Sequence, residues 1–313
     1  RFNLELVSAF AMEHRIPLVT PFYNELDLIR GNPYLFQLSP SMKTCYREMA
    51  RLVASKHDYN IVYVREEDSL DVEKHEYFKN LIFDGFDDYR PDEPVIFKEL
   101  VLTLNHTDEI IHSLRSDRKH LLVVPTTNEA LASRVVNTLY YTLEDFQIEV
   151  IGTAFWPEFS SIDYRYYHEL GLMFGNPFWL DYLDPGVDSF LTIYREYFYK
   201  EPEAMSKKGI NYGIAGYDIS LYFLNALRAF GKGFILSLDN YRTDQVLYPY
   251  HFERVSGSGG FENTSLPYYR FLPDMSIEQF KVPPLPDRSR FFFPWKRNER
   301  PYLEREMDYP PDR

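Results

Sequence analysis

The sequence predicts an α/β protein in which parallel sheets are flanked by helices. Short apolar runs rich in β-branched residues alternate along the chain with amphipathic helical stretches, and this alternation builds right-handed βαβ units. The chain has 313 residues, of which 45% are hydrophobic and 26% charged. It is therefore long enough for two lobes, each with its own core. No apolar run reaches the roughly 18 residues that a membrane-spanning helix needs.

The expected strands are short, and most are followed by a helical stretch. We place strands at residues 14–21, 34–38, 59–64, 94–100, 119–126 and 146–154. Helices are expected at residues 69–83, 105–116 and 126–141, and two more at 184–202 and 211–233. Residues 246–282 are expected to form strands joined by the glycine-rich turn "SGSGGFEN". Such sheets bind ligands at the carboxyl ends of their strands. The loops expected to face a ligand therefore follow Val19, Val64, Val124 and Gly152, and they read "TPFYNE", "REEDSL", "PTTNE" and "TAFWPE".

Three helix starts carry capping signals. Ser39 and Pro40 are expected to open one helix as its cap and first-turn proline. Thr126 with Glu129 forms a predicted capping box. Asp184 is expected to cap the helix that Pro185 begins.

Composition and charge exclude several classes of function. The formal charge of -13 repels phosphate backbones, which argues against a nucleic-acid partner. The single cysteine, Cys45, excludes an internal disulfide and a cysteine-based zinc site. The aromatic content of 17% suits binding walls and interfaces as well as ordinary cores.

No motif nominates an enzyme. The sequence contains no GxSxG, P-loop or dinucleotide-binding glycine pattern. His106 and His112 lie six residues apart and off one helical face, while Asp71 and His75 are better explained by a solvated helix face than by a metal. We therefore expect a non-catalytic protein with no metal and no cofactor.

Several segments, in this order, resemble the type I periplasmic-binding-protein family, the amino-acid-binding proteins of ABC transporters. "HRIPLVTP" and "NPYLFQLSPSMKTCYREMARLV" are similar to a strand of the family's first lobe and to its crossing strand and following helix. "DPGVDSFLTIYREYFYKEP" and "AGYDISLYFLNALRAFG" are similar to its "FxxxYxxxFxxxP…YDAxxxxxxAL" signature. The resemblance covers about residues 2–282 and implies a two-lobed protein that is exported to the periplasm or cell envelope, with a lipid anchor or an outer-membrane association as further expectations.

The resemblance also implies lobe boundaries. Lobe I comprises residues 1–38 and 183–245, and lobe II comprises residues 39–182 and 246–282. Residues 283–313 form an extended C-terminal arm. Because the family begins with several βα units before its "IPLVTP" strand, lobe I is expected to lack its N-terminal part in this chain. The aromatic-rich style looks most like a Bacteroidota variety, which often carries a LysM module, so peptidoglycan is a further expected partner.

The resemblance nominates five ligand-binding residues: Thr20, Tyr23, Trp156, Tyr217 and Asp218. Thr20 and Tyr23 follow the "IPLV" strand, where the family makes hydroxyl and amide contacts to its ligand. Trp156, next to Phe155, either stacks on a ligand or plugs an emptied cleft. Asp218 either braces the start of its helix, where an anion is favourable, or holds a ligand's ammonium group, and Tyr217 has the same two alternatives.

Two features depart from the family and keep a second function open. The loop "REEDSLD" is acidic and lacks the aromatic and glycine residues that close on an amino acid, which puts an amino-acid ligand in doubt. The C-terminal arm carries an apolar patch, Phe291, Phe292, Phe293 and Trp295, that is expected to dock on an envelope or outer-membrane protein. The two hypotheses are a binding protein for a small, amino-acid-like polar ligand and a scaffold subunit with a vestigial cleft.

Overall fold

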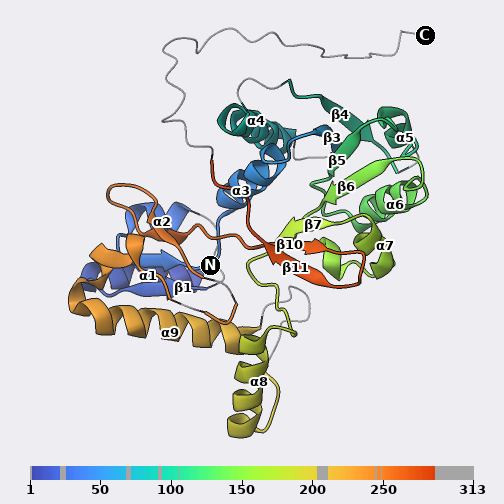
Figure 1. The fold of residues 1–313 in the computed structure, drawn as a ribbon. Helices are drawn as coiled ribbons and strands as arrows, with labels where there is room; N and C mark the ends of the chain where they lie inside the picture. Colours follow the sequence, from blue (N-terminus) through green and yellow to red (C-terminus); the bar gives the residue numbers. More distant parts are fainter. Residues whose placement is uncertain are drawn as a thin grey trace.

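The computed structural model folds into two α/β lobes (Figure 1). It describes residues 2–21, 26–67, 72–90, 94–104, 106–202, 211–243, 245–247 and 249–285. Both lobes hold a sheet with helices against it, and most strand pairs are parallel. The expected α/β fold with parallel-rich, helix-flanked sheets is confirmed.

The larger lobe is built on a sheet of seven described strands in the order β11-β10-β7-β6-β5-β3-β4. Strands β3 to β7 pair in parallel, and β10 and β11 add an antiparallel edge. The strands are β3 (Tyr59–Glu66), β4 (Phe97–Leu102), β5 (Lys119–Val123), β6 (Gln147–Ile151), β7 (Met173–Gly175), β10 (Tyr268–Phe271) and β11 (Ile277–Phe280).

Helices cover both faces of this sheet, and for that reason the middle of its central strand β3 is apolar on both faces. Ile61 and Tyr63 of β3 pack with α3 (Met42–Ala54) and α4 (Val72–Tyr89). The intervening Val62 and Val64 pack on the opposite face. That face is covered by α5 (Glu109–Ser113), α6 (Glu129–Tyr140) and α7 (Tyr164–Glu169). The period-two alternation therefore divides one strand between two cores.

The smaller lobe has a sheet of four described strands in the order β1-β2-β9-β8. These are β1 (Leu18–Thr20), β2 (Leu35–Gln37), β8 (Phe252–Arg254) and β9 (Phe261–Asn263). One face packs against α9 (Tyr212–Phe230) and the 3-10 helix η2 (Gly231–Asn240). The helices α1 (Phe2–His14), α2 (Asp27–Gly31) and α8 (Pro185–Phe198) complete the lobe.

The pairing of β8 and β9 moves one expected lobe boundary. Residues 246–282 were assigned as a whole to lobe II, but β9 pairs in parallel with β2 and β8 pairs with β9. In the structure the chain therefore leaves the smaller lobe after Asn263. The register of β2 and β9 places Phe36 beside Phe261, and their rings stack with centroids 4.9 Å apart. This contact holds β9 in the smaller lobe.

The described chain passes between the lobes three times, at residues 38–41, 176–184 and 263–267. Side chains and backbone tie these connections together. The Ser41 amide donates to Glu262 Oε1 at 2.7 Å, and Asn263 Nδ2 donates to the Leu38 carbonyl at 3.0 Å. The Asn176 amide donates to the Pro267 carbonyl at 3.1 Å, so each connection is bonded to another.

Two of the three expected caps are wrong. Ser41, not Ser39, caps α3, because its hydroxyl accepts from the Thr44 amide at 3.2 Å. Asn128, not Thr126, caps α6, and its side-chain oxygen accepts from the Ala130 amide. In both segments a second hydrogen-bonding side chain lies two residues further along, nearer to the first helical turn. The cap at Asp184 is confirmed.

Asn263 offers a direct test of the hinge. Its side-chain oxygen accepts from the amides of His251 and Ser265, while its nitrogen donates to Leu38. We expect Asn263→Ala to lower the free energy of unfolding by about 1–3 kcal/mol, because it leaves buried backbone groups without partners. Chemical denaturation measures this change. Asn137→Ala, on the exposed side of α6, is the matched control, and an equal loss in both variants would contradict a hinge role.

Candidate ligand site at the carboxyl edge of the larger sheet

Polar side chains gather where the parallel strands of the larger sheet end. Glu66 ends β3, Thr126 follows β5 and Thr153 follows β6. Asn128 Nδ2 donates to Glu66 Oε1 at 2.7 Å, and Thr153 Oγ1 donates to the Thr126 carbonyl at 3.4 Å. Because the carboxyl ends of parallel strands share one edge, these groups form a continuous polar rim.

Trp156 lies beneath this rim, in the core of the lobe. Its indole is fully buried and donates from Nε1 to the Thr126 carbonyl at 3.0 Å. The Tyr167 hydroxyl donates to the Trp156 carbonyl at 2.7 Å. The two expected roles of Trp156, stacking on a ligand and plugging a cleft, stay predictions.

The residues next to Trp156 form an open hollow of about 340 Å³. It is lined by Thr127, Phe155, Glu158 and Phe159. Three of these residues lie in or next to the short 3-10 turn η1 (Trp156–Glu158). In this turn the Glu158 amide donates to the Phe155 carbonyl, and the Phe159 amide donates to the Trp156 carbonyl. The sequence predicted that the loops holding Thr127, Phe155 and Glu158 face the cleft, but it did not single out Glu158, Phe159 or Thr127. The direction in which the side chains of a turn point cannot be predicted from strand periodicity.

Two acids near this hollow have shifted pKa values for opposite reasons. Partial burial raises the pKa of the Glu158 carboxyl above its ordinary value. Hydrogen bonds from Ser161, including its amide at 2.8 Å, lower the pKa of the exposed Glu129 carboxyl. Glu129 was expected to complete a capping box, but it clips the η1 loop to the start of α6 instead.

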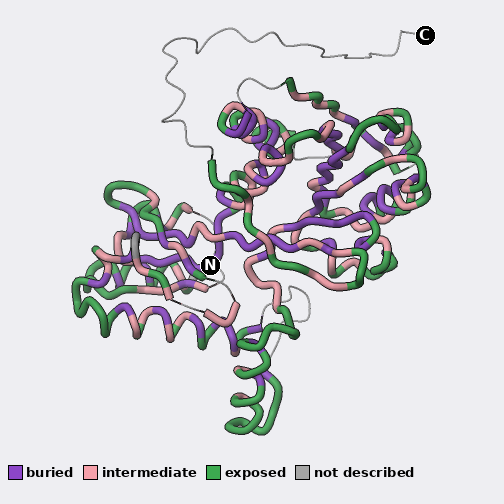
Figure 2. Tube along the Cα trace, viewed as in Figure 1, coloured by how far each residue is buried: buried purple, intermediate pink, exposed green. Residues whose placement is uncertain are grey.

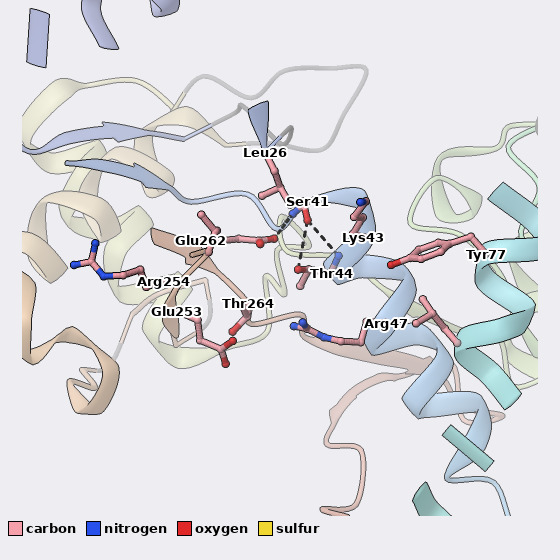
Figure 3. Close-up of a pocket in the computed structure, with 12 residues that line it drawn as sticks. Leu26, Ser41, Lys43, Thr44, Arg47, Tyr77, Glu253, Arg254, Glu262 and Thr264 are labelled. Carbon is pink, nitrogen blue, oxygen red and sulfur yellow. Dashed lines mark hydrogen bonds between the residues drawn. The ribbon is translucent and has the colours of Figure 1, made fainter. Parts of the chain in front are cut away.

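A second hollow, of about 300 Å³, lies at the hinge between the lobes (Figure 3). Its walls come from both lobes and carry mixed charge. They are formed by Leu26, Ser41, Lys43, Thr44, Arg47, Tyr77, Leu81, Glu253, Arg254, Val255, Glu262 and Thr264. Glu262 points at the start of α3, where it accepts from the Ser41 amide, so the positive end of that helix already has an anionic partner.

The predicted residues of the smaller lobe lie apart from both hollows. Thr20 is buried at the end of β1, where its carbonyl accepts from the Leu38 amide. Tyr217 is partly exposed and packs on Phe190 with ring centroids 5.0 Å apart. Tyr23 lies outside the described residues, as do Phe291, Phe292, Phe293 and Trp295. Ligand contacts by Thr20 and Tyr217 stay predictions.

Asp218 is a fully buried carboxylate with two backbone partners. Its two oxygens accept from the amides of Val246 and Leu247, each at 2.8 Å. The cap of α9 is Asn211, whose side chain accepts from the Ile214 amide. Asp218 therefore braces the segment that leads into β8 rather than the first turn of its own helix. Binding of an ammonium group by Asp218 stays a prediction.

Reactive chemistry is weakly supported in the described part of the chain. No group of three or more His, Cys, Asp and Glu side chains there is arranged to hold a metal ion. Burial, together with the nearby acids Glu262 and Glu48, raises the pKa of the Cys45 thiol to about 12, so the thiol stays protonated near neutral pH. Within the same residues, no helix has the length and apolar character needed to cross a membrane.

Solved structures share this two-lobed fold. The chain aligns with a substrate-binding protein of an ABC transporter from Desulfitobacterium hafniense, solved with Leu, at 14% identity and a TM-score of 0.54, covering 89% of this chain and 77% of that one. A Rhodospirillum rubrum protein assigned to branched-chain amino acid ABC transport gives a TM-score of 0.61 at 12% identity, with coverages of 87% and 75%.

A branched-chain amino acid ABC transporter periplasmic ligand-binding protein from Burkholderia xenovorans gives a TM-score of 0.56 at 12% identity, with coverages of 90% and 74%. The structural neighbours are thus type I periplasmic-binding proteins, and at these identities the likeness establishes the fold. No protein-family model matches the sequence, and no curated protein matches it.

Gly152 tests how tightly the rim is packed. A Cβ at this position would lie 2.6 Å from the ring of Trp156. We expect Gly152→Ala to destabilise the protein by about 1–3 kcal/mol, since the buried indole has no room to move. Gly216→Ala, in α9, meets nothing within 4 Å and should be neutral or stabilising by about 0.5–1 kcal/mol. Thermal unfolding of both variants checks the pair, and similar melting temperatures would contradict this packing.

Asp218 predicts a pH dependence of stability. Burial raises the pKa of Asp218 from 3.8 to about 6, against the opposing effect of its two amide donors. The folded state therefore binds a proton that the unfolded state lacks between these values. This contribution to stability is fully present below the unfolded pKa and is lost as the pH rises through the folded pKa.

The free energy of unfolding of the wild type, minus that of Asp218→Asn, should therefore fall between about pH 4 and pH 6. Urea denaturation at several pH values measures the difference. Asp188→Asn, in the first turn of α8, is a control acid outside this contact. A difference that stays constant with pH would refute the raised pKa.

Proposed function

We propose that this protein is a non-catalytic binding protein of the cell envelope that takes up a small polar ligand between its two lobes. The observation that carries this proposal is the arrangement of a polar, hollowed carboxyl edge on a lobe that is joined to a second lobe by three chain crossings. Two-lobed α/β proteins close on ligands by hinge motion. The structural neighbours that share this fold are named as periplasmic or substrate-binding proteins, which supports the periplasm as the location.

The arrangement supports binding more than catalysis. The rim offers hydroxyls, amide groups and carboxylates, which fix the orientation of a ligand, and two phenyl rings, which supply apolar area. The partly buried Cys45, whose thiol stays protonated near neutral pH because its pKa is raised, is a poor nucleophile. An amino-acid-like ligand is consistent with the neighbours, one of which was solved with Leu.

A scaffold role is the second candidate, because apolar side chains are exposed on the smaller lobe. Leu6, Val7 and Phe10 of α1 are exposed, as are Leu224, Leu227 and Phe230 of α9. The tip of α8 projects from the body, and Tyr197 and Tyr199 there are 76% and 92% exposed (Figures 1 and 2). Such surfaces favour burial against another polypeptide.

The finer expectations belong to this scaffold candidate. They are docking of the patch Phe291, Phe292, Phe293 and Trp295 on an outer-membrane protein, association with peptidoglycan through a LysM module, a lipid anchor and a Bacteroidota origin.

Ligand-dependent closure tests the binding role. Small molecules that co-purify from native membranes would be identified by mass spectrometry and added back to the stripped protein. We expect the radius of gyration from small-angle scattering to fall on addition, because closure brings the two lobes together. A stripped protein with an unchanged radius and unchanged melting temperature, but with a co-purifying envelope protein, would instead support the scaffold.

A further inference from the structure

The hollow at the carboxyl edge of the larger sheet has walls of an unusual composition. One of its four lining side chains is a carboxylate, two are phenyl rings and one is a hydroxyl, and none is cationic. No described hydrogen-bond donor pairs with the Glu158 carboxylate. Partial burial raises the pKa of this carboxyl. A hollow of about 340 Å³ that combines one unpaired carboxylate with two phenyl side chains is suited to a positively charged organic molecule.

The η1 turn holds these side chains in place from below. Trp156, in the middle of the loop, is fully buried, and its indole N–H is bonded to the Thr126 carbonyl. In a 3-10 turn, side chains three residues apart eclipse each other, so Phe155 and Glu158 project on the same side. Phe159 follows directly, and its amide donates to the Trp156 carbonyl at 3.0 Å. The anchored indole therefore directs its neighbours outward to the hollow.

The far end of the loop is fixed as well. The Ser161 amide donates to Glu129 at 2.8 Å, and Asn128 bonds to Glu66. Glu129 lies in the first turn of α6, where the helix dipole is positive and would repel a cation. Its negative charge offsets that repulsion. Phe155 is 45% exposed, whereas Phe159 is partly buried and packs against the apolar core, so Phe155 offers a ligand the larger apolar surface. The site is thus formed before a ligand arrives, which lowers the entropy lost on binding.

We propose that the ligand of this hollow is an organic cation with an alkylated or primary ammonium group, held by the carboxylate of Glu158 and the ring faces of Phe155 and Phe159. This inference rests on the proposed binding function and narrows its ligand class. The ammonium charge is balanced by Glu158, and its alkyl groups contact the rings through cation–π and apolar contacts. Thr127 supplies a hydroxyl for a polar substituent of the ligand.

Isothermal titration calorimetry with paired probes tests this inference on the full chain. Choline is compared with its uncharged isostere 3,3-dimethylbutan-1-ol, arginine is compared with citrulline, and leucine represents the ligand of a structural neighbour. We expect each cationic probe to bind the wild type roughly tenfold or more tightly than its neutral partner. Glu158→Gln should remove that preference, and Phe155→Leu should weaken the binding of the cationic probes by roughly three- to tenfold.

Glu144→Gln is the matched control. This acid precedes β6 and so lies toward the opposite edge of the sheet, and the variant should bind like the wild type. Equal melting temperatures establish that the variants fold.

Three outcomes separate the hypotheses. Charge-dependent binding that Glu158→Gln removes and Glu144→Gln keeps supports the inference. Binding of leucine or the neutral probes with no effect of Glu158→Gln overturns the cation inference and leaves the binding function standing. Failure of every probe to bind the wild type overturns the inference, and the binding function falls with it only if no co-purified small molecule closes the lobes.

Discussion

The two-lobed architecture depends on a pair of neighbouring side chains at the end of β9. Glu262 accepts a hydrogen bond from the Ser41 amide at the start of α3, and the Asn263 side chain donates one to the Leu38 carbonyl in the first crossing. Both residues are nearly or fully buried, so each bond replaces a contact with water that the fold has removed. One strand of the smaller lobe thereby sets where the helix of the larger lobe begins. Together with the bond from the Asn176 amide to the Pro267 carbonyl, these contacts join all three connections between the lobes.

The same logic operates inside the larger lobe, around Trp156. The indole occupies the space above Gly152, where even a methyl group would clash, and it bonds to the loop after β5. Two loops from adjacent strands are thereby joined through one buried ring. Because the ring is buried and hydrogen-bonded, it anchors the backbone of the η1 turn whose side chains form the wall of the hollow.

The sequence predicted the α/β class because both periodicities are strong. β3 is apolar on both faces, and β5 and β6 are largely so, which only a helix-covered sheet allows. It did not predict that β8 and β9 belong to the smaller lobe, because their pairing with β2 depends on contacts more than 200 residues apart in the chain. Local propensity carries no record of such partners. The caps were misplaced for a smaller reason, since Ser39, Ser41, Thr126 and Asn128 all satisfy the same local rule.

The candidate site shows the same division. The loop "TAFWPE" was identified from its place after a strand, and this required only the direction of the parallel sheet. Which of its side chains points outward depends on the 3-10 turn, whose orientation is decided by the burial of Trp156. For Asp218 the sequence left two roles open, a brace at the start of its helix and a contact to a ligand, because an acid in an apolar helix needs a partner. Its partners are two amides 28 and 29 residues away, and no spacing rule could have found them.

The two hollows differ in a way that bears on how a ligand could act. The edge hollow is confined to one lobe and has no cationic wall, whereas the hinge hollow has Lys43 and Arg47 on α3 across from Glu253 on β8. A rotation of the lobes leaves the first hollow's own walls intact, because all of them move together. It changes the separation of the charges in the second, whose walls belong to different lobes. The wall from β8 also carries Arg254, so both attraction and repulsion act across the hinge hollow. Salt screens both, because these side chains are exposed to solvent.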